Sequence, residues 1–211
     1  MIKKKAIKNY NNTKNVVIIL ACGEGLRFKS KVPKQFTDIS GEILLNHTIN
    51  NFLKNSEIGH ILLVLNKKHK KHFIKITKNK RISITYGGDT RQKSVFNGLI
   101  FVNKFRPLKV LIHDANRPFV DSKLISQLFA QLKKYKAVIP RMKIQDTIKK
   151  IETNKVSSIN RDKIFTLQTP QGFNFKILFQ KHKEANVKNL TDDSSLFDSK
   201  SEIIKYINGS Y

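Results

Sequence analysis

Residues 16–35, VVIILACGEGLRFKSKVPKQ, contain the clearest structural signal in the chain. The first five residues are apolar without a break, which is typical of a strand buried on both faces of a parallel sheet. Residues 21–25 then form a turn of small residues with two glycines, and glycine lets a ligand come close to backbone N–H groups. The stretch predicts a buried strand that ends in a phosphate-binding loop. An ordinary strand-to-helix turn with solvated lysines is the alternative.

The glycine turn matches neither of two familiar phosphate motifs. A dinucleotide-binding fingerprint needs a third glycine at position 28, which is Phe28 here. A P-loop ends in Gly-Lys-Ser or Gly-Lys-Thr, and neither tripeptide occurs in the chain. What remains is a glycine turn followed by cations with the spacing G-x-G-x-R-x6-K. The cations are Arg27, Lys29, Lys31 and Lys34.

Length and composition favour a single basic domain. The 211 residues can bury a full core, and the net charge is +26. The lysines are spread from Lys3 to Lys205, which indicates a solvated coat that attracts anionic substrates. Cys22 is the only cysteine, and we expect an inert, buried thiol in a protein of the reducing cytoplasm. No apolar run is long enough to span a membrane, and residues 1–14 read as a polar lead-in without the apolar core of a signal peptide.

Alternating buried strands and amphipathic helices predict an α/β fold. We expect strands at residues 16–20, 61–65, 82–86, 110–112, 137–140 and 203–207, and helices at residues 43–54, 66–80, 95–102, 121–135 and 176–185. This alternation predicts a doubly wound, mostly parallel sheet in one domain over residues 1–211. Two alternating segments about a polar turn predict a β-hairpin arm at about residues 141–160. Because an isolated ribbon is marginally stable, we expect the arm to pack on a second subunit.

The turn after the strand at residues 82–86 is a second candidate ligand site. Residues 87–89 are Gly-Gly-Asp, and they lead into a helix with Arg91 and Ser94 at its start. Such a turn can bind an anion or a base at a helix N-terminus, and it can equally be a plain structural turn.

Asp114 is a candidate metal ligand at the end of another buried strand. Open α/β sheets bind ligands at the carboxyl ends of their strands, and a carboxylate there suits Mg²⁺ bound to phosphates. An Asp114–Arg117 ion pair that only shapes the loop is the alternative.

Five separated segments together resemble one enzyme family. They are ACGEGLRFKSKVPKQF, GGDTRQKSV, HDANRPF, QDTIK with INRDKIFTLQTPQGF, and TDDSS. In this order and spacing they resemble the cytidylyltransferases of the non-mevalonate isoprenoid pathway, which make CDP-methylerythritol from CTP and methylerythritol phosphate. The resemblance covers about residues 15–210. It implies a fold like that of the nucleotide-diphospho-sugar transferases, and a homodimer with interlocking hairpin arms.

The resemblance also implies a role for individual residues. The backbone of Ala21, Cys22, Gly23, Glu24 and Gly25 would wrap the CTP phosphates. Gly87, Gly88, Asp89 and Ser94 would hold the cytosine and ribose, with Ala115 against the nucleotide. Arg27 and Lys34 would be catalytic cations that bind CTP, and Asp114 would bind Mg²⁺ or another divalent cation. The sugar phosphate would contact Arg117, Thr147 and Thr169, together with Arg161, a catalytic residue that reaches the neighbouring subunit's site.

The sequence departs from the family pattern in three places. Cys22 and Asn116 stand where the family usually has alanine, and both are small enough to be tolerated. The family also continues beyond the final Gly-Ser pair into a strand with a substrate-binding lysine and then a helix. From the sequence we therefore expect either a C-terminally truncated sequence of a family member or a site that lacks one sugar-phosphate cation and part of its cover. If the chain does end at Tyr211, we expect weaker binding of the sugar phosphate and lower stability.

Other functions remain open on the sequence alone. A ribitol-phosphate cytidylyltransferase shares these motifs, and a truncated, catalytically impaired relative could act only as a dimer partner. A nucleic-acid-binding protein would need basic residues clustered with stacking aromatics, whereas this chain has no tryptophan and its lysines are dispersed. We therefore expect neither a nucleic-acid partner nor a membrane partner.

Overall fold

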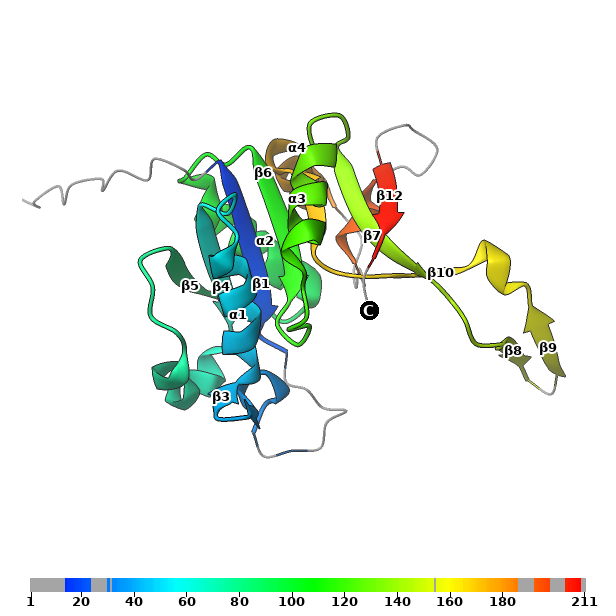
Figure 1. Cartoon of the computed structure of the whole chain (residues 1–211), viewed down its shortest axis with the longest axis horizontal. Helices are drawn as coiled ribbons and strands as arrows, with labels where there is room; N and C mark the ends of the chain where they lie inside the picture. The colour runs from blue at the N-terminus through cyan, green and yellow to red at the C-terminus, as the bar shows by residue number, and fades with distance from the viewer. Residues whose placement is uncertain are drawn as a thin grey trace, which may run out of the picture.

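A central sheet covered by helices on both faces forms the body of the molecule, and a two-stranded arm projects from it (Figure 1). The computed structural model describes residues 14–23, 30, 32–153, 155–185, 192–197 and 204–209. Within these residues the main sheet has eight strands in the order β10-β7-β11-β6-β1-β4-β5, and β12 pairs with β7.

Four parallel strands make up the half of the sheet that carries the candidate site. The strand β1 (Asn15–Ala21) lies between β4 (His60–Leu65) and β6 (Lys109–Asp114), and β5 (Ile82–Tyr86) borders β4. The register pairs the last residues of these strands with one another: Leu20 with Asp114, Ala21 with Leu65, and Leu65 with Tyr86. The carboxyl ends of all four strands therefore meet at one edge of the sheet.

Helices cover both faces of the sheet, which confirms the predicted doubly wound architecture. One face carries α1 (Leu44–Lys54) and α3 (Ser122–Gln131), and the other carries α2 (Arg91–Asn103) and α4 (Phe175–Glu184). Successive residues of β1 enter opposite cores: Val17 packs on the first face and Ile18 on the second, and both are fully buried. The unbroken apolar run in this strand follows from that double burial.

The remaining strands make the sheet mixed rather than wholly parallel. The strand β11 (Gln171–Asn174) lies antiparallel between β6 and β7 (Ala137–Lys143). The strand β12 (Ile204–Asn208) runs parallel to β7 on the side away from β11. The strand β10 (Phe165–Leu167) pairs antiparallel with the end of β7 on the side opposite β12. The mostly parallel sheet is thus confirmed, with β10 and β11 as the antiparallel strands.

The segment predicted as a helix at residues 66–80 is instead a 3₁₀ segment, η3 (Lys67–Lys75). Its sequence, KKHKKHFIK, places lysines four residues apart, Lys67 before Lys71 and Lys71 before Lys75. Like charges at this spacing repel one another on an α-helix. None of its residues is buried, so core packing does not offset the repulsion.

Two helices have different bounds from those predicted. The helix expected at residues 95–102 begins at Arg91, because the Thr90 side chain accepts a hydrogen bond from the Lys93 backbone N–H at 3.0 Å and caps it there. The helix expected to reach residue 135 ends at Gln131.

The remaining elements are short. They are η2 (Lys34–Phe36), β2 (Asp38–Ile39), β3 (Glu42–Ile43), η4 (Arg161–Lys163) and η5 (Asp193–Leu196).

The predicted hairpin is present and forms its own two-stranded sheet. It consists of β8 (Ile148–Glu152) paired antiparallel with β9 (Lys155–Ile159), and Figure 1 shows it well away from the main sheet. It starts later than residue 141 because β7 runs on to Lys143. Ile151 and Val156 face each other across the hairpin with 76% and 63% of their surface exposed.

Among the described residues, no helix has both the length and the apolar character needed to cross a membrane.

His60 makes the stability of this fold depend on pH. Burial, aided by the positive charge of Lys104, lowers the pKa of His60 from 6.5 to about 4. The unfolded chain therefore binds a proton near pH 6.5 that the folded chain binds only near pH 4, so stability is complete above that window and falls as the pH drops through it. We expect this group to cost about 2 kcal/mol of unfolding free energy by about pH 5.

Urea unfolding of the wild type and of His60→Gln at pH 7 and pH 5 measures this contribution. Glutamine can still hydrogen-bond Ser83, which lies 3.0 Å from the His60 ring, but it does not titrate. The variant should lose less stability on acidification than the wild type, and equal losses would contradict the assignment.

Candidate functional site

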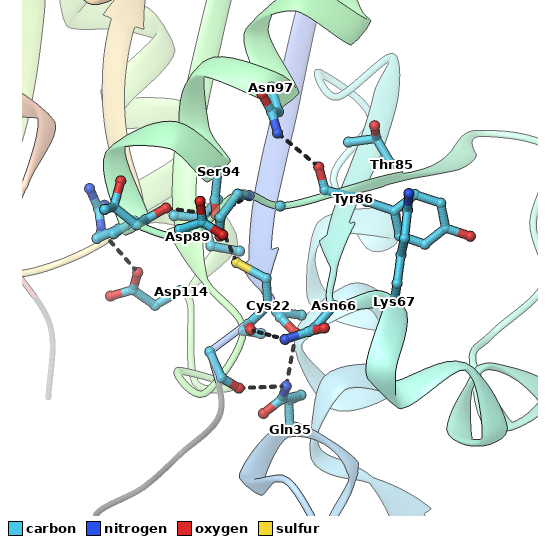
Figure 2. Close-up of a pocket in the computed structure, with 18 of the residues that line it drawn as sticks. Cys22, Gln35, Asn66, Lys67, Thr85, Tyr86, Asp89, Ser94, Asn97 and Asp114 are labelled. Atoms are coloured by element: carbon cyan, nitrogen blue, oxygen red, sulfur yellow. Dashed lines mark hydrogen bonds and ion pairs between the residues drawn. The ribbon is translucent and has the colours of Figure 1, made fainter.

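A cavity of about 1420 Å³ lies at the edge where the four parallel strands end (Figure 2). Most of the residues predicted to bind CTP line it, namely Ala21, Cys22, Gly23, Lys34, Gly87, Gly88, Asp89, Ser94 and Ala115. The candidate metal ligand Asp114 lines it as well. Three further predicted residues, Glu24, Gly25 and Arg27, lie outside the described residues. The structure therefore brings together segments that are far apart in the sequence.

Side chains from neighbouring elements hold the turn that follows β1. The Gln35 amide donates hydrogen bonds to the carbonyls of Ala21 at 2.8 Å and Gly23 at 3.1 Å, and Gln35 itself is buried. Asn66, which follows β4, donates to the Cys22 carbonyl at 3.4 Å. These bonds fix the backbone of the turn without a ligand. Gln35 and Asn66 were missed by sequence reasoning, because nothing in their local sequence marks them as supports for this turn.

Ser94 holds the second glycine turn. Its hydroxyl accepts a hydrogen bond from the Gly88 backbone N–H at 3.1 Å and lies 2.8 Å from the Thr90 carbonyl. The Cys22 thiol donates to the same hydroxyl at 3.2 Å, which joins the two turns (Figure 2). Cys22 is only half-buried and lines the cavity, so the prediction of a buried, inert thiol is wrong about its burial. The reason is that the strand buries its side chains only as far as Ala21.

Gly87 has no room for a side chain. A Cβ atom at this position would lie 2.7 Å from the Ser94 hydroxyl oxygen and 2.8 Å from Cys22 Cβ. We expect Gly87→Ala to force the two turns apart and lower the unfolding free energy by about 1–3 kcal/mol. If the cavity binds CTP, as the sequence predicts, the variant should also weaken that binding about tenfold. Denaturant unfolding and a CTP titration measure the two effects.

Gly23→Ala is the matched control for stability. A Cβ atom there meets no described heavy atom within 4 Å. It should leave the unfolding free energy close to that of the wild type. Equal stability of the Gly87 and Gly23 variants would show that the contact between the turns tolerates a methyl group.

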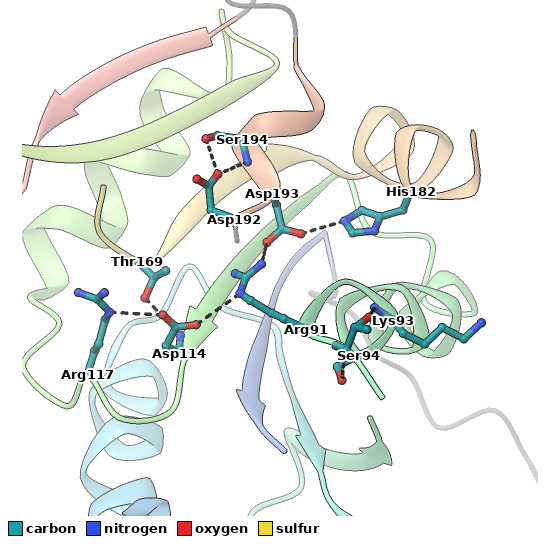
Figure 3. Close-up of polar contacts among 11 residues, drawn as sticks. Arg91, Lys93, Ser94, Asp114, Arg117, Thr169, His182, Asp192, Asp193 and Ser194 are labelled. Carbon is teal, nitrogen blue, oxygen red and sulfur yellow. Dashed lines mark hydrogen bonds and ion pairs between the residues drawn. The ribbon is translucent and has the colours of Figure 1, made fainter. Parts of the chain in front are cut away.

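Asp114 sits at the end of β6 between two arginines (Figure 3). Its carboxylate is 3.4 Å from Arg117 Nε and 4.0 Å from Arg91 Nε, and 31% of the side chain is exposed. The Thr169 hydroxyl accepts a hydrogen bond from the Asp114 backbone N–H at 3.2 Å. The ion pair with Arg117 is therefore present, and the carboxylate is also open to the cavity.

The loop that follows Asp114 is held by a buried histidine. His113 is fully buried, and its Nε2 lies 3.0 Å from the Arg117 carbonyl. Burial lowers the pKa of His113 to about 4, although its hydrogen bond to that carbonyl and the charge of Asp114 work in the opposite direction. A neutral ring whose Nε2–H donates to Arg117 thus sets the path of the loop.

A buried ion pair joins the start of α2 to η5. Arg91 donates to the Asp193 carboxylate at 2.7 Å, and His182 of α4 lies 2.9 Å from the other oxygen of the same carboxylate. Burial alone would raise the pKa of Asp193. The hydrogen bond from His182 and the charge of Arg91 outweigh burial, so the pKa lies below its usual value. Burial likewise lowers the pKa of Arg91, and the charges of Asp193 and Asp114 outweigh this and raise it.

The sequence places Arg91 at a helix start and contains the TDDSS segment, but it does not indicate that the two meet. The two partners are 102 positions apart, and no local pattern links them. Thr191, the first residue of that segment, lies outside the described residues.

The four residues predicted to bind the sugar phosphate divide into two groups. Arg117 and Thr169 adjoin Asp114, as described above. Thr147 and Arg161 flank the two strands of the arm, and Arg161 donates to the carbonyl of Gln145. None of the four is among the residues that line the cavity. One chain therefore does not bring all four together.

Lysines add positive charge around the cavity. Lys34, Lys67 and Lys68 line it, and the Lys67 ammonium lies 5.1 Å from the centre of the Tyr86 ring. Lys67 and Lys68 were interpreted from sequence as part of a solvated face. Their position suits a polyanionic ligand, since positively lined clefts concentrate anions.

Comparisons with known proteins point to one family. Residues 15–211 match the family model described as "IspD: 2-C-methyl-D-erythritol 4-phosphate cytidylyltransferase". The cytidylyltransferase of that name from Azobacteroides pseudotrichonymphae is 37% identical over 187 residues, which cover 87% of this chain and 83% of the relative. The crystal structure of the 4-diphosphocytidyl-2C-methyl-D-erythritol synthase from Anaerococcus prevotii is similar with a TM-score of 0.78 and 31% identity, over 96% of this chain and 89% of that one.

Some relatives are much longer than this chain. The bifunctional enzyme IspD/IspF from Pelagibacter ubique is 41% identical over 192 residues, which cover 91% of this chain and 51% of the relative. The chain spans about half the length of this protein and of two further bifunctional relatives. The family match nevertheless extends over almost all of the described fold. The chain belongs to the IspD family, the 2-C-methyl-D-erythritol 4-phosphate cytidylyltransferases.

Proposed function

We propose that this protein transfers a cytidylyl group from CTP to 2-C-methyl-D-erythritol 4-phosphate, giving CDP-methylerythritol and pyrophosphate. One observation carries the proposal: in a member of the IspD family, Gly23 of the first glycine turn, the second glycine turn, Lys34 and Asp114 converge on one cavity. The cavity lies at the carboxyl ends of parallel strands, where open α/β sheets bind nucleotides.

The reaction calls for positioning and positive charge rather than for a strong base. An oxygen of the sugar phosphate is already ionised and attacks the α-phosphorus of CTP in line, while the bond to pyrophosphate breaks. Two anions must be brought together, and the charge that develops in the transition state must be compensated. Lys34 lies in the cavity where it can supply that charge. We assign the same role to Arg27 from the sequence.

We propose that Asp114 binds Mg²⁺ or another divalent cation together with the triphosphate. The described residues contain no group of three or more His, Cys, Asp or Glu side chains that could hold a metal. A single partly exposed carboxylate beside a phosphate cavity nonetheless fits Mg²⁺, which typically takes one or two carboxylates and fills its other positions with phosphate oxygens and water. When bound there, the cation would neutralise charge on the triphosphate.

We propose that the protein is a homodimer in which the arm of one chain reaches the site of the other. The arm carries Ile151 and Val156 as an exposed apolar pair, and it carries Thr147 and Arg161 away from the cavity of its own chain. Burial of the pair against a second copy would stabilise the ribbon and would bring Arg161 to the partner's sugar phosphate. The mass in solution, measured by light scattering, tests this arrangement.

Ribitol phosphate is the main alternative to methylerythritol phosphate as the acceptor substrate. The relatives described above are named for methylerythritol phosphate, so ribitol phosphate is not favoured. Pyrophosphate release from CTP and Mg²⁺, measured with a panel of polyol phosphates, tests the choice. We expect release with methylerythritol 4-phosphate. Faster release with ribitol phosphate, or CTP binding without release for any acceptor, would overturn the assignment.

We further propose that the protein works in the cytoplasm without a nucleic-acid partner. The single cysteine and the dispersed lysines of the sequence support this. Retention of the protein on immobilised RNA or DNA at physiological salt would argue against it.

A further inference from the structure

We propose that Asp193 is a positioning residue for the metal site: it holds the Arg91 side chain away from Asp114, so that the Asp114 carboxylate stays available to a divalent cation. The inference rests on the proposed function, because it assumes that Asp114 meets a metal–triphosphate complex. It assigns a catalytic consequence to an ion pair that otherwise looks purely structural.

Arg91 lies between two carboxylates and is shared unequally (Figure 3). Its Nη1 is 2.7 Å from an Asp193 oxygen, whereas its Nε is 4.0 Å from an Asp114 oxygen. The Asp193 side chain is 1% exposed and the Asp114 side chain is 31% exposed. The short contact is therefore the buried one, and the long contact faces the cavity.

The buried partner is itself held in place. Asp193 is the first residue of η5, which is capped by the neighbouring Asp192 side chain through the Ser194 backbone N–H at 2.6 Å. The buried ring of His182 lies 2.9 Å from the Asp193 oxygen that Arg91 does not contact. With one oxygen facing His182 and the other facing Arg91, the carboxylate has a fixed orientation, and the guanidinium is fixed with it.

Loss of the Asp193 charge should release Arg91 towards Asp114. Among the described residues, Asp114 is the other carboxylate that pairs with the guanidinium within 4.0 Å, and Arg117 already lies 3.4 Å from it. The charge of Asp192 also acts on Arg91, but from a greater distance. A carboxylate enclosed by two guanidinium groups is a poor ligand for Mg²⁺, because the cation must displace one of them and approach the positive charge of both.

The test is a calorimetric titration of Mg²⁺ into the full-length protein saturated with CTP. We expect Asp193→Asn to weaken Mg²⁺ binding about tenfold, the scale of one charge-assisted hydrogen bond gained by Asp114. Turnover at saturating Mg²⁺ should recover most of the wild-type rate. A merely structural role would lower turnover without a shift in the Mg²⁺ dependence.

Asp192→Asn is the matched control. It changes the net charge by the same amount one residue away and leaves the direct Arg91–Asp193 ion pair intact, so it reports how much of the effect comes from charge near Arg91 without that pair. Asparagine is also a good cap, so η5 should persist. We expect Mg²⁺ binding within about twofold to threefold of the wild type. An equal loss in Asp192→Asn and Asp193→Asn would reduce the effect to net charge and overturn the inference.

The double variant Arg91→Gln/Asp193→Asn shows whether the weaker Mg²⁺ binding comes from the released Arg91 side chain or from the loss of Asp193 itself. It should restore the Mg²⁺ affinity, because no arginine at position 91 remains to pair with Asp114. Arg91→Gln alone should bind Mg²⁺ at least as tightly as the wild type, and this variant decides the matter if Asp193→Asn does not fold. A double variant as weak as Asp193→Asn, or weaker Mg²⁺ binding in Arg91→Gln, would overturn the proposal.

The Mg²⁺-binding measurement and the activity measurement test different claims and can fail independently. Mg²⁺ and CTP binding without pyrophosphate release would refute the proposed reaction, and the titrations would still decide the role of Asp193. Normal activity with unchanged Mg²⁺ affinity in Asp193→Asn would refute the role of Asp193 alone. A wild-type protein saturated with CTP that binds no Mg²⁺ would overturn the inference, since it requires a cation at Asp114.

Discussion

Lys34→Ala should lower kcat for pyrophosphate release by about a hundredfold or more, the scale seen when a preorganised electrostatic stabiliser is lost. Lys34 begins η2 and lines the cavity, and the next residue, Gln35, anchors the turn after β1. The ammonium group is thus held on a fixed backbone beside the proposed triphosphate. Its loss removes charge compensation from the transition state. Arg27→Ala should have an effect of similar size.

The measurement is steady-state release of pyrophosphate at saturating CTP and methylerythritol 4-phosphate. Lys123→Ala is the control, because Lys123 is an exposed residue of α3 and its removal causes the same change in net charge. It should retain near-wild-type kcat. Near-wild-type kcat in Lys34→Ala would refute its catalytic role, and a large loss in Lys123→Ala would point to a general charge effect.

Asp114→Asn should nearly abolish activity, with a loss of about a hundredfold or more at ordinary Mg²⁺ concentrations. The amide has almost the same shape as the carboxylate but lacks the charge that a divalent cation requires. Stability should change little, because the Arg117 ion pair is partly exposed and such pairs contribute at most about 1 kcal/mol. A Mg²⁺ titration of activity and a urea unfolding curve distinguish the two effects.

Asp121→Asn is the control for this variant. Asp121 caps α3 with its side chain, which accepts a hydrogen bond from the Lys123 backbone N–H at 3.0 Å, and asparagine caps helices equally well. Its activity and Mg²⁺ dependence should match those of the wild type. An Asp114→Asn variant with unchanged Mg²⁺ dependence would mean that Asp114 serves only the loop, as an ion pair with Arg117.

The sequence predicted those parts of the fold that depend on local patterns. Continuous apolar runs at residues 16–20 and 61–65 indicated strands buried on both faces, and β1 and β4 are such strands. The glycine turns and Asp114 follow these and similar strands, so their meeting at one cavity could be expected from the sheet alone. The helix predicted over η3 was wrong, because amphipathic spacing takes no account of the repulsion between like-charged lysines four residues apart on a helix.

The unpredicted parts of the site depend on contacts between distant residues. Gln35 supports the turn after β1 through two carbonyls, and Arg91 pairs with Asp193 across 102 positions. Each of these side chains reads locally as an ordinary polar residue. Only the packing of α2 and α4 on the same face, with η5 beside α4, brings the buried carboxylate to the guanidinium. Long-range pairing of this kind has no periodicity for a sequence pattern to reveal.

The antiparallel insertion of β11 has a consequence for how the chain folds. The parallel strands β1, β4, β5 and β6 come from residues 15–114, so they can associate early, but β6 gains its second neighbour only when residues 171–174 arrive. Until then the apolar edge at Val110–Ile112 has no hydrogen-bonding partner on that side. A nascent chain halted before residue 171 would expose this unpaired, apolar edge to other chains, so the emergence of β11 from the ribosome is the step after which aggregation through the edge of β6 should cease.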